Sequence, residues 1–149
     1  MINKSKLTAK GKVTLQLFDE NGVLKNEQHV TNVVVDNGVD YIADRMNSNG
    51  TTIMSHMAVG DDATAASVTD TGLINELGRV SLTSAVVTDN SIQYIGDFGA
   101  GTGTGAVTEA GILNNSSGGT LLCRTVFAVV NKGASDTLKI TWTVTVSDS

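Results

Sequence analysis

The chain has 149 residues, enough for one domain with a substantial core, and its formal net charge of −5 argues against a general nucleic-acid-binding role. Aromatic residues make up only 4% of the chain and proline is absent, so the core must be aliphatic and the turns must use Gly, Asn, Asp and Ser. The single cysteine, Cys123, excludes an intramolecular disulfide, and no apolar run is long enough to span a membrane.

The first twelve residues contain four lysines and no acidic residue: Lys4, Lys6, Lys10 and Lys12. This composition predicts a short basic arm, Met1–Lys12, and the absence of an apolar core distinguishes it from a signal peptide. One interpretation of the arm is a solvated tail. The other is an arm that leaves the domain and binds an acidic neighbour.

The first regular pattern follows this arm. Val13, Leu15 and Leu17 alternate with polar residues, which predicts a strand over residues 12–18. The Asp19–Gly22 segment has the composition of a turn, and a returning strand is expected over Val23–Val30.

One helix is predicted, over Val35–Met46. Val35, Val39, Ile42 and Met46 recur at helical spacing, and Asp36 can cap the first turn. A helix with a single apolar stripe is expected to pack on a sheet.

The middle of the chain has weaker patterns. Ser55–Gly60 is short and apolar, as in a strand, whereas Asp61–Gly72 is a loop of small residues without periodicity. Gly72–Leu77 is compatible with one helical turn, capped by Asp70 or Thr71.

Further strands are expected in the second half of the chain. The alternation of Val80, Leu82 and Val86 predicts one of them, and a turn at Thr88–Ser91 leads to another that contains Ile92, Tyr94 and Phe98.

The clearest pattern lies near the C-terminus. Apolar residues alternate strictly with polar ones over residues 138–146: Leu138, Ile140, Trp142, Val144 and Val146. Before it, Leu121–Val130 is apolar at both odd and even positions, as in a strand covered on both faces by a second sheet or another subunit. We therefore expect a mainly β fold: one domain over residues 1–149, an antiparallel β-sandwich, jelly-roll-like or barrel-like, with one short amphipathic helix packed on a sheet.

The residues that could perform chemistry do not form a known motif. The Gly99–Gly105 cluster lacks the spacing of a dinucleotide fingerprint and the Lys-Ser or Lys-Thr pair of a phosphate loop. His29 and His56 have no metal-ligand spacing, and no serine lies in a nucleophile elbow. We therefore predict no catalytic residue, no metal and no cofactor.

Glu109 is the exception, because it lies in an apolar segment that we expect to be a buried strand. A buried carboxylate must be paired or protonated. Arg79 and Arg124 lie in equally apolar surroundings, so we predict a structural ion pair between Glu109 and one of these two arginines.

Several segments resemble, in the same order, a module of tailed-bacteriophage virion proteins. They lie between His56 and Ser147 and read MAVGDDATAA, NELGRVSLTS, FGAGTGTGAVTEAGILN, GGTLLCRTVF and NKGASDTLKITWTVTVS. The Val35–Met46 helix also resembles the helix that precedes this module, whereas the first thirty residues lie outside the resemblance. The resemblance implies a structural role in the virion, after assembly in the host cytoplasm.

We therefore expect a non-enzymatic capsid decoration (cement) protein that binds the major capsid protein on the outside of the head and stabilises it. The partner contact is assigned to the basic arm, and the chain is expected to form a homo-oligomer, such as a trimer, without nucleic acid or membrane. One alternative is a tail component: a fibre-attachment adaptor, a baseplate protein or a tail-surface protein. Another is a carbohydrate-binding adhesion module, which would need exposed aromatic residues.

Overall fold

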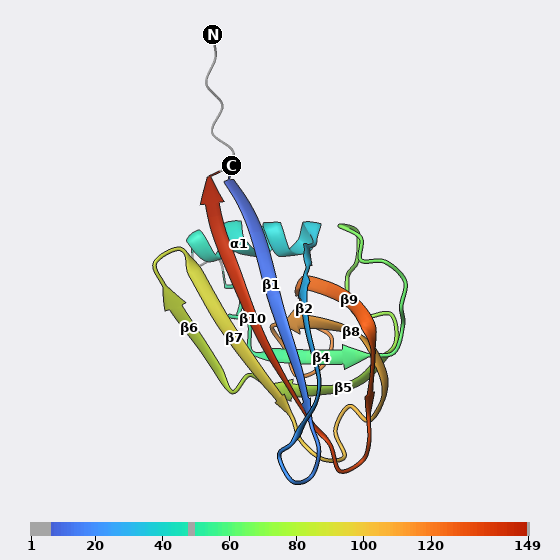
Figure 1. The fold of residues 1–149 in the computed structure, drawn as a ribbon. Helices are drawn as coiled ribbons and strands as arrows, with labels where there is room; N and C mark the ends of the chain where they lie inside the picture. Colours follow the sequence, from blue (N-terminus) through green and yellow to red (C-terminus); the bar gives the residue numbers. More distant parts are fainter. Residues whose placement is uncertain (1–6, 48–49, 149) are drawn as a thin grey trace.

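A computed structural model describes residues 7–47 and 50–148, which form two five-stranded sheets and one helix (Figure 1). Sheet A has the strand order β2-β1-β10-β7-β6 and sheet B the order β3-β9-β8-β4-β5. Each pair of neighbouring strands is antiparallel. The predicted fold class, a mainly β antiparallel sandwich with one short helix, is therefore confirmed. The elements in chain order are β1 (Leu7–Phe18), β2 (Leu24–Thr31), β3 (Val33–Val34), α1 (Asp36–Met46), β4 (His56–Gly60), β5 (Glu76–Ser81), β6 (Ser84–Thr88), β7 (Ser91–Phe98), β8 (Gly105–Leu113), β9 (Leu121–Lys132) and β10 (Thr137–Asp148).

Sheet A is built around β10, which lies between β1 and β7. The alternation along β10 is the one that the sequence predicts: the apolar residues point into the sandwich and the threonines point out. Four of these inward side chains are at most 5% exposed: Leu138, Ile140, Trp142 and Val144.

The predicted basic arm is wrong for residues 7–12, because these residues belong to β1. They pair with the end of β10, from Leu7 opposite Asp148 to Lys12 opposite Thr143. Lys10 and Lys12 are exposed on the outer face of sheet A, since the alternate positions face the core. Lys4 and Lys6, the other two lysines assigned to the arm, lie outside the described residues.

The sequence does not predict this pairing with β10, because the inward positions 9 and 11 carry Ala9 and Gly11, which have no large apolar side chain. Gly11 also allows a close approach, because a Cβ at this position would overlap Oδ1 of Asn32 and lie 2.9 Å from Nε1 of Trp142. The strand therefore begins well before its first buried large apolar side chain, Val13, because Leu7 at its start is 73% exposed.

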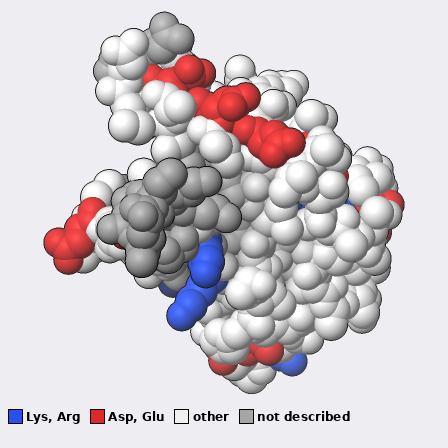
Figure 2. Space-filling view, turned by 90° about the horizontal axis from the view of Figure 1, so that it is seen from above, with Lys and Arg blue, Asp and Glu red and all other residues white. Residues whose placement is uncertain are grey.

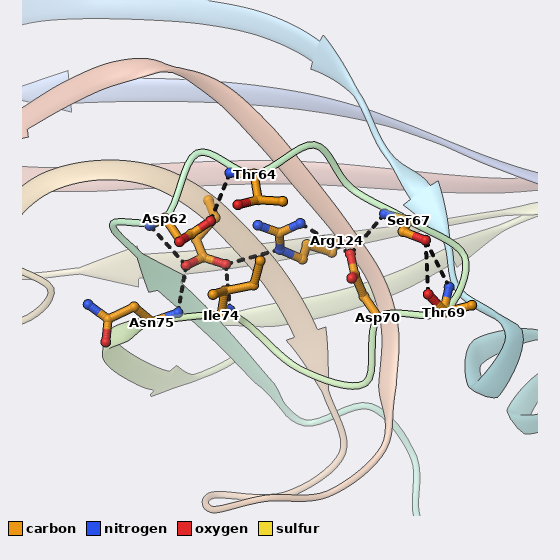
Figure 3. Close-up of polar contacts among 9 residues, drawn as sticks. Asp62, Thr64, Ser67, Thr69, Asp70, Ile74, Asn75 and Arg124 are labelled. Carbon is orange, nitrogen blue, oxygen red and sulfur yellow. Dashed lines mark hydrogen bonds and ion pairs between the residues drawn. The ribbon is translucent and has the colours of Figure 1, made fainter.

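Sheet B is covered on both faces. Its inner face packs on sheet A, and a second, smaller cluster on its outer face joins Ala58, Leu113 and Leu121 to Val35, with Leu73 packed against it. Leu73 belongs to the loop of residues 61–75, which crosses the outer face (Figure 3). This loop, together with sheet A, covers both faces of β9 from Leu121 to Thr125, whereas Ala128 and Val129 further along the strand are exposed. The predicted two-sided cover of Leu121–Val130 is therefore right for the first half of the segment only.

Helix α1 lies across one end of the sandwich and contacts β9 (Figure 1). The predicted apolar stripe is half right. Val35 and Ile42 pack on the core, but Val39 is 55% and Met46 83% exposed, whereas Gly38 and Tyr41 are buried. A Cβ on Gly38 would overlap the carbonyl oxygen of Leu122, so the absence of a side chain decides which face of α1 packs on β9. The helix also lacks a side-chain cap. Within the described ranges, no helix is long and apolar enough to cross a membrane.

Two local predictions around residue 80 are also wrong. Gly72–Leu77 does not form a helical turn, because β5 begins at Glu76. The alternating run from Val80 to Val86 is two strands in different sheets, since the chain passes from β5 in sheet B to β6 in sheet A. Periodicity alone does not reveal such a change of sheet, because the alternation continues across it.

We predict that Trp142→Ala lowers the free energy of unfolding by about 3–5 kcal/mol, the usual range for removing a large core side chain. Trp142 has 0% exposure and is the largest fully buried side chain. Urea-induced unfolding, followed by circular dichroism, measures the change. A variant as stable as the parent would contradict the assignment of Trp142 to the core.

Candidate functional site

Among the fully buried polar groups of the described residues, the carboxylate of Glu109 on β8 accepts the most hydrogen bonds. Its Oε1 accepts hydrogen bonds from Arg124 Nε at 3.0 Å and from the backbone N–H of Ile74 at 2.9 Å. Its Oε2 accepts from the backbone N–H groups of Asp62 at 3.1 Å and Asn75 at 2.9 Å. One carboxylate therefore holds both ends of the loop of residues 61–75. Figure 3 labels the three loop residues that bind it, Asp62, Ile74 and Asn75.

Arg124 on β9 is also fully buried and lies between two carboxylates. Besides its bond to Glu109, it donates from Nη1 to Oδ2 of Asp70 at 3.1 Å. Asp70 is in the middle of the same loop and also accepts from the backbone N–H of Ser67. The side chains of Glu109, Arg124 and Asp70, which we call the buried triad although that of Asp70 is 17% exposed, thus fix the two ends and the middle of the loop. Figure 3 labels Arg124 and Asp70.

The predicted ion pair of Glu109 is therefore formed with Arg124 and not with Arg79. Arg79 instead binds Glu76, at 2.6 Å, and the backbone carbonyls of Asn115 and Gly118. The strand order gives the reason, because β4 separates β5, which carries Arg79, from β8, which carries Glu109. Arg79 stabilises a second loop, between β8 and β9.

A glycine is needed where the loop leaves β4. A Cβ on Gly60 would overlap the carbonyl oxygen of Asn75 and lie 2.6 Å from Oε2 of Glu109. Asp62 lies two residues further on. The side-chain hydroxyl and backbone N–H of Thr64 donate to its carboxyl group and lower the pKa of this group. The beginning of the loop is thus shaped by local hydrogen bonds as well as by the buried triad.

Sequence reasoning missed Asp70 and the three backbone donors. The loop has no periodic face, and backbone N–H groups leave no trace in a sequence. The one available signal was that Asp70 is the only acidic residue between Asp62 and Glu76, in a segment of otherwise small or uncharged residues.

The hydrogen bonds of Glu109 determine what this carboxylate can do. Each of its oxygens accepts two hydrogen bonds and neither is exposed, so the group stabilises structure and is not placed to exchange a proton with a substrate. Cys123 is fully buried, and burial raises the pKa of its thiol, which makes it unreactive. Within residues 7–47 and 50–148, no three His, Cys, Asp or Glu side chains are arranged to hold a metal ion.

The surface offers a different feature, an apolar groove of about 480 Å³ between α1 and the β6–β7 hairpin. Ala85 and Val87 of β6 form part of its wall, and Ile42 and Tyr41 of α1 lie on the helix side. The end of the molecule where α1 lies carries a row of acidic side chains (Figure 2). Asp36, Asp40 and Asp44 of α1 are four residues apart, so they share one face of the helix.

The chain matches no protein-family model, and no curated protein or solved structure is significantly similar to it.

We predict that Glu109→Leu and Arg124→Leu each lower the free energy of unfolding by about 3–5 kcal/mol, because each leaves a buried charge without its main partner. The double variant should be more stable than the sum of the two single changes implies, with a coupling of about 0.5–3 kcal/mol. It does not regain the stability of the parent, since the loop N–H groups that bind Glu109 lose their acceptor. Urea-induced unfolding of all four proteins measures these values.

The matched control is the more exposed pair of Glu76 and Arg79, whose side chains are 34% and 11% exposed. Glu76→Leu is expected to cost about 1 kcal/mol or less, because water can solvate the remaining charge. If Glu109→Leu lowered the free energy of unfolding no more than Glu76→Leu does, the buried triad would not stabilise the protein as proposed.

Proposed function

We propose that the chain is a non-enzymatic structural protein of a tailed-bacteriophage virion, a decoration protein that binds the major capsid protein on the outside of the head and stabilises it. The observation that carries the proposal is the set of hydrogen bonds that the Glu109 carboxylate accepts. Glu109 is the polar residue most suggestive of chemistry, yet three of its four hydrogen bonds go to the loop of residues 61–75. The fourth goes to Arg124, which itself binds Asp70 of that loop. A protein whose buried charges fix its loops is suited to presenting a constant surface to a partner.

The sequence motifs support the same proposal. In the segments that resemble the virion module, MAVG ends at Gly60, TEAGI contains Glu109 and LLCRTVF contains Arg124. Gly60 allows the close approach of the loop, and Glu109 and Arg124 bind it. The resembling residues therefore act together in one structural arrangement.

The aromatic side chains favour protein contacts over carbohydrate stacking. Five of the six are at most 9% exposed: Tyr41, Tyr94, Phe98, Phe127 and Trp142. The sixth, Phe18, is partly buried. A carbohydrate-binding surface usually presents aromatic faces to the sugar, so this distribution supports the decoration role over the adhesion role.

The outer face of sheet A is the surface that we propose for attachment. Lys10 and Lys12 are exposed two residues apart on β1, and within the described part of the chain neither forms an ion pair. Threonines of β10 lie opposite both lysines, so the surrounding surface is polar and neutral. A pair of cations on such a surface is complementary to an acidic shell.

We predict that purified virions contain on the order of hundreds of copies of the protein, because a decoration protein occupies many equivalent positions on the capsid. Quantitative mass spectrometry of particles measures this number. About a few dozen copies or fewer would favour the tail alternative instead, since tail parts follow the lower symmetry of the tail. Absence from particles would refute both structural roles.

We also predict that Lys12→Gln weakens occupancy on purified particles and reduces the loss of occupancy with rising salt, because exposed charges are screened over about 8 Å at physiological ionic strength. Lys139→Gln is the matched control. It removes one positive charge from the outer face of the same sheet, but Lys139 lies opposite a carboxylate, Asp97, instead of a threonine. Equal effects of the two changes would argue against the proposed attachment surface.

A further inference from the structure

The exposed edge of β6 differs from the other sheet edges of the described structure. The edge strands are β2 and β6 in sheet A and β3 and β5 in sheet B. Charged side chains interrupt two of these edges, with Lys25 and Glu27 on β2 and Glu76 and Arg79 on β5, while β3 has only two residues. Charges and short length are the usual means of preventing edge-to-edge association.

By contrast, β6 has five residues, Ser84–Thr88, with no charge and no proline. Val86 is 55% exposed and Val87 68% exposed. In Figure 1 the strand lies at the margin of the molecule, where β7 is its only neighbour in the sheet. An uncharged, apolar and exposed edge of this kind is a template for pairing with another strand.

The register determines which backbone groups are free. The β6–β7 hairpin places Thr88 opposite Ser91 and Val86 opposite Gln93. A two-residue turn makes Thr88 and Ser91 a hydrogen-bonded pair, and in an antiparallel ladder such pairs alternate with non-hydrogen-bonded ones. The N–H and C=O groups of Ala85 and Val87 therefore point away from β7, toward the open edge.

This arrangement is self-complementary. If two copies of β6 align antiparallel with Val86 at the symmetry axis, Ala85 of each copy lies opposite Val87 of the other. The outward groups of these residues then form two hydrogen-bonded pairs, with Val86 facing its own equivalent between them. No like charges meet in this register, although the chain as a whole has a net charge of −5.

We propose that β6 is a homodimer interface through which two copies join their A sheets edge to edge around a two-fold axis at Val86. Because Ala85 and Val87 also line the apolar groove, the second copy extends the wall of that groove. The dimer depends only on the chain's own β6, so it can be tested independently of attachment to a capsid.

The test is analytical ultracentrifugation of the whole protein over a wide concentration range. The parent is expected to form dimers, and Val86→Lys to raise the dimer dissociation constant about tenfold or more, because it places like charges directly opposite each other. Val23→Lys is the matched control. Val23 is 58% exposed but lies outside β6, so this variant should dimerise like the parent.

A charge-swap mixture makes the test specific for the symmetry axis. Val86→Lys and Val86→Glu should each dimerise poorly alone, whereas an equimolar mixture should recover heterodimers, since opposite charges then face each other. In the parent protein, amide hydrogen exchange at Ala85 and Val87 should slow as concentration rises. Circular dichroism checks that both variants fold.

Three results would overturn the proposal. The first is a parent that stays monomeric at every concentration. Binding of a strand from another protein to β6, without dimerisation of the parent, counts as the same result. The second is a dimer that Val86→Lys leaves unchanged. The third is a mixture of the two folded charge variants that does not associate.

Discussion

The fold depends on one constraint at the outer face of sheet B, the need to compensate a carboxylate and a guanidinium that are both removed from water. Glu109 and Arg124 are each 0% exposed, and the desolvation of such groups is costly unless their hydrogen bonds are satisfied. The loop of residues 61–75 supplies three backbone N–H groups and Asp70. The loop therefore gains a defined conformation without regular secondary structure, because the charges beneath it allow few alternatives.

The sequence predicts well those features that depend only on which side chains are buried. Strict alternation from Leu138 to Val144 indicates the central strand of sheet A, and the isolated Glu109 in an apolar segment indicates an ion pair with a nearby arginine. Both are local consequences of burial, since a side chain that faces the core must be apolar or compensated. The sandwich class follows from several such strands joined by turns rich in glycine and asparagine.

Structural features that depend on backbone geometry are either not predicted from the sequence or predicted wrongly. Gly38 packs on β9 because it has no side chain, so the apolar residues at Val39 and Met46 point outward. Gly11 similarly hides the beginning of β1, and the backbone donors to Glu109 have no sequence signature at all. Close backbone approaches and backbone hydrogen bonds depend on the assembled fold, which residue type alone does not reveal.

The position of β10 at the centre of sheet A affects how the protein folds. Its neighbours in the sheet are β1 and β7, and the Thr8–Ser147 hydrogen bond joins residues 139 positions apart. All strands of sheet B precede β10 in the chain, so they can pair during synthesis. β1 cannot pair with β10 until the C-terminal end of the chain has been made. Until then, the inward side chains of β1, Val13, Leu15 and Leu17, lack their neighbours on β10, which are Trp142, Ile140 and Leu138. Such high contact order favours slow folding, in which sheet A closes last.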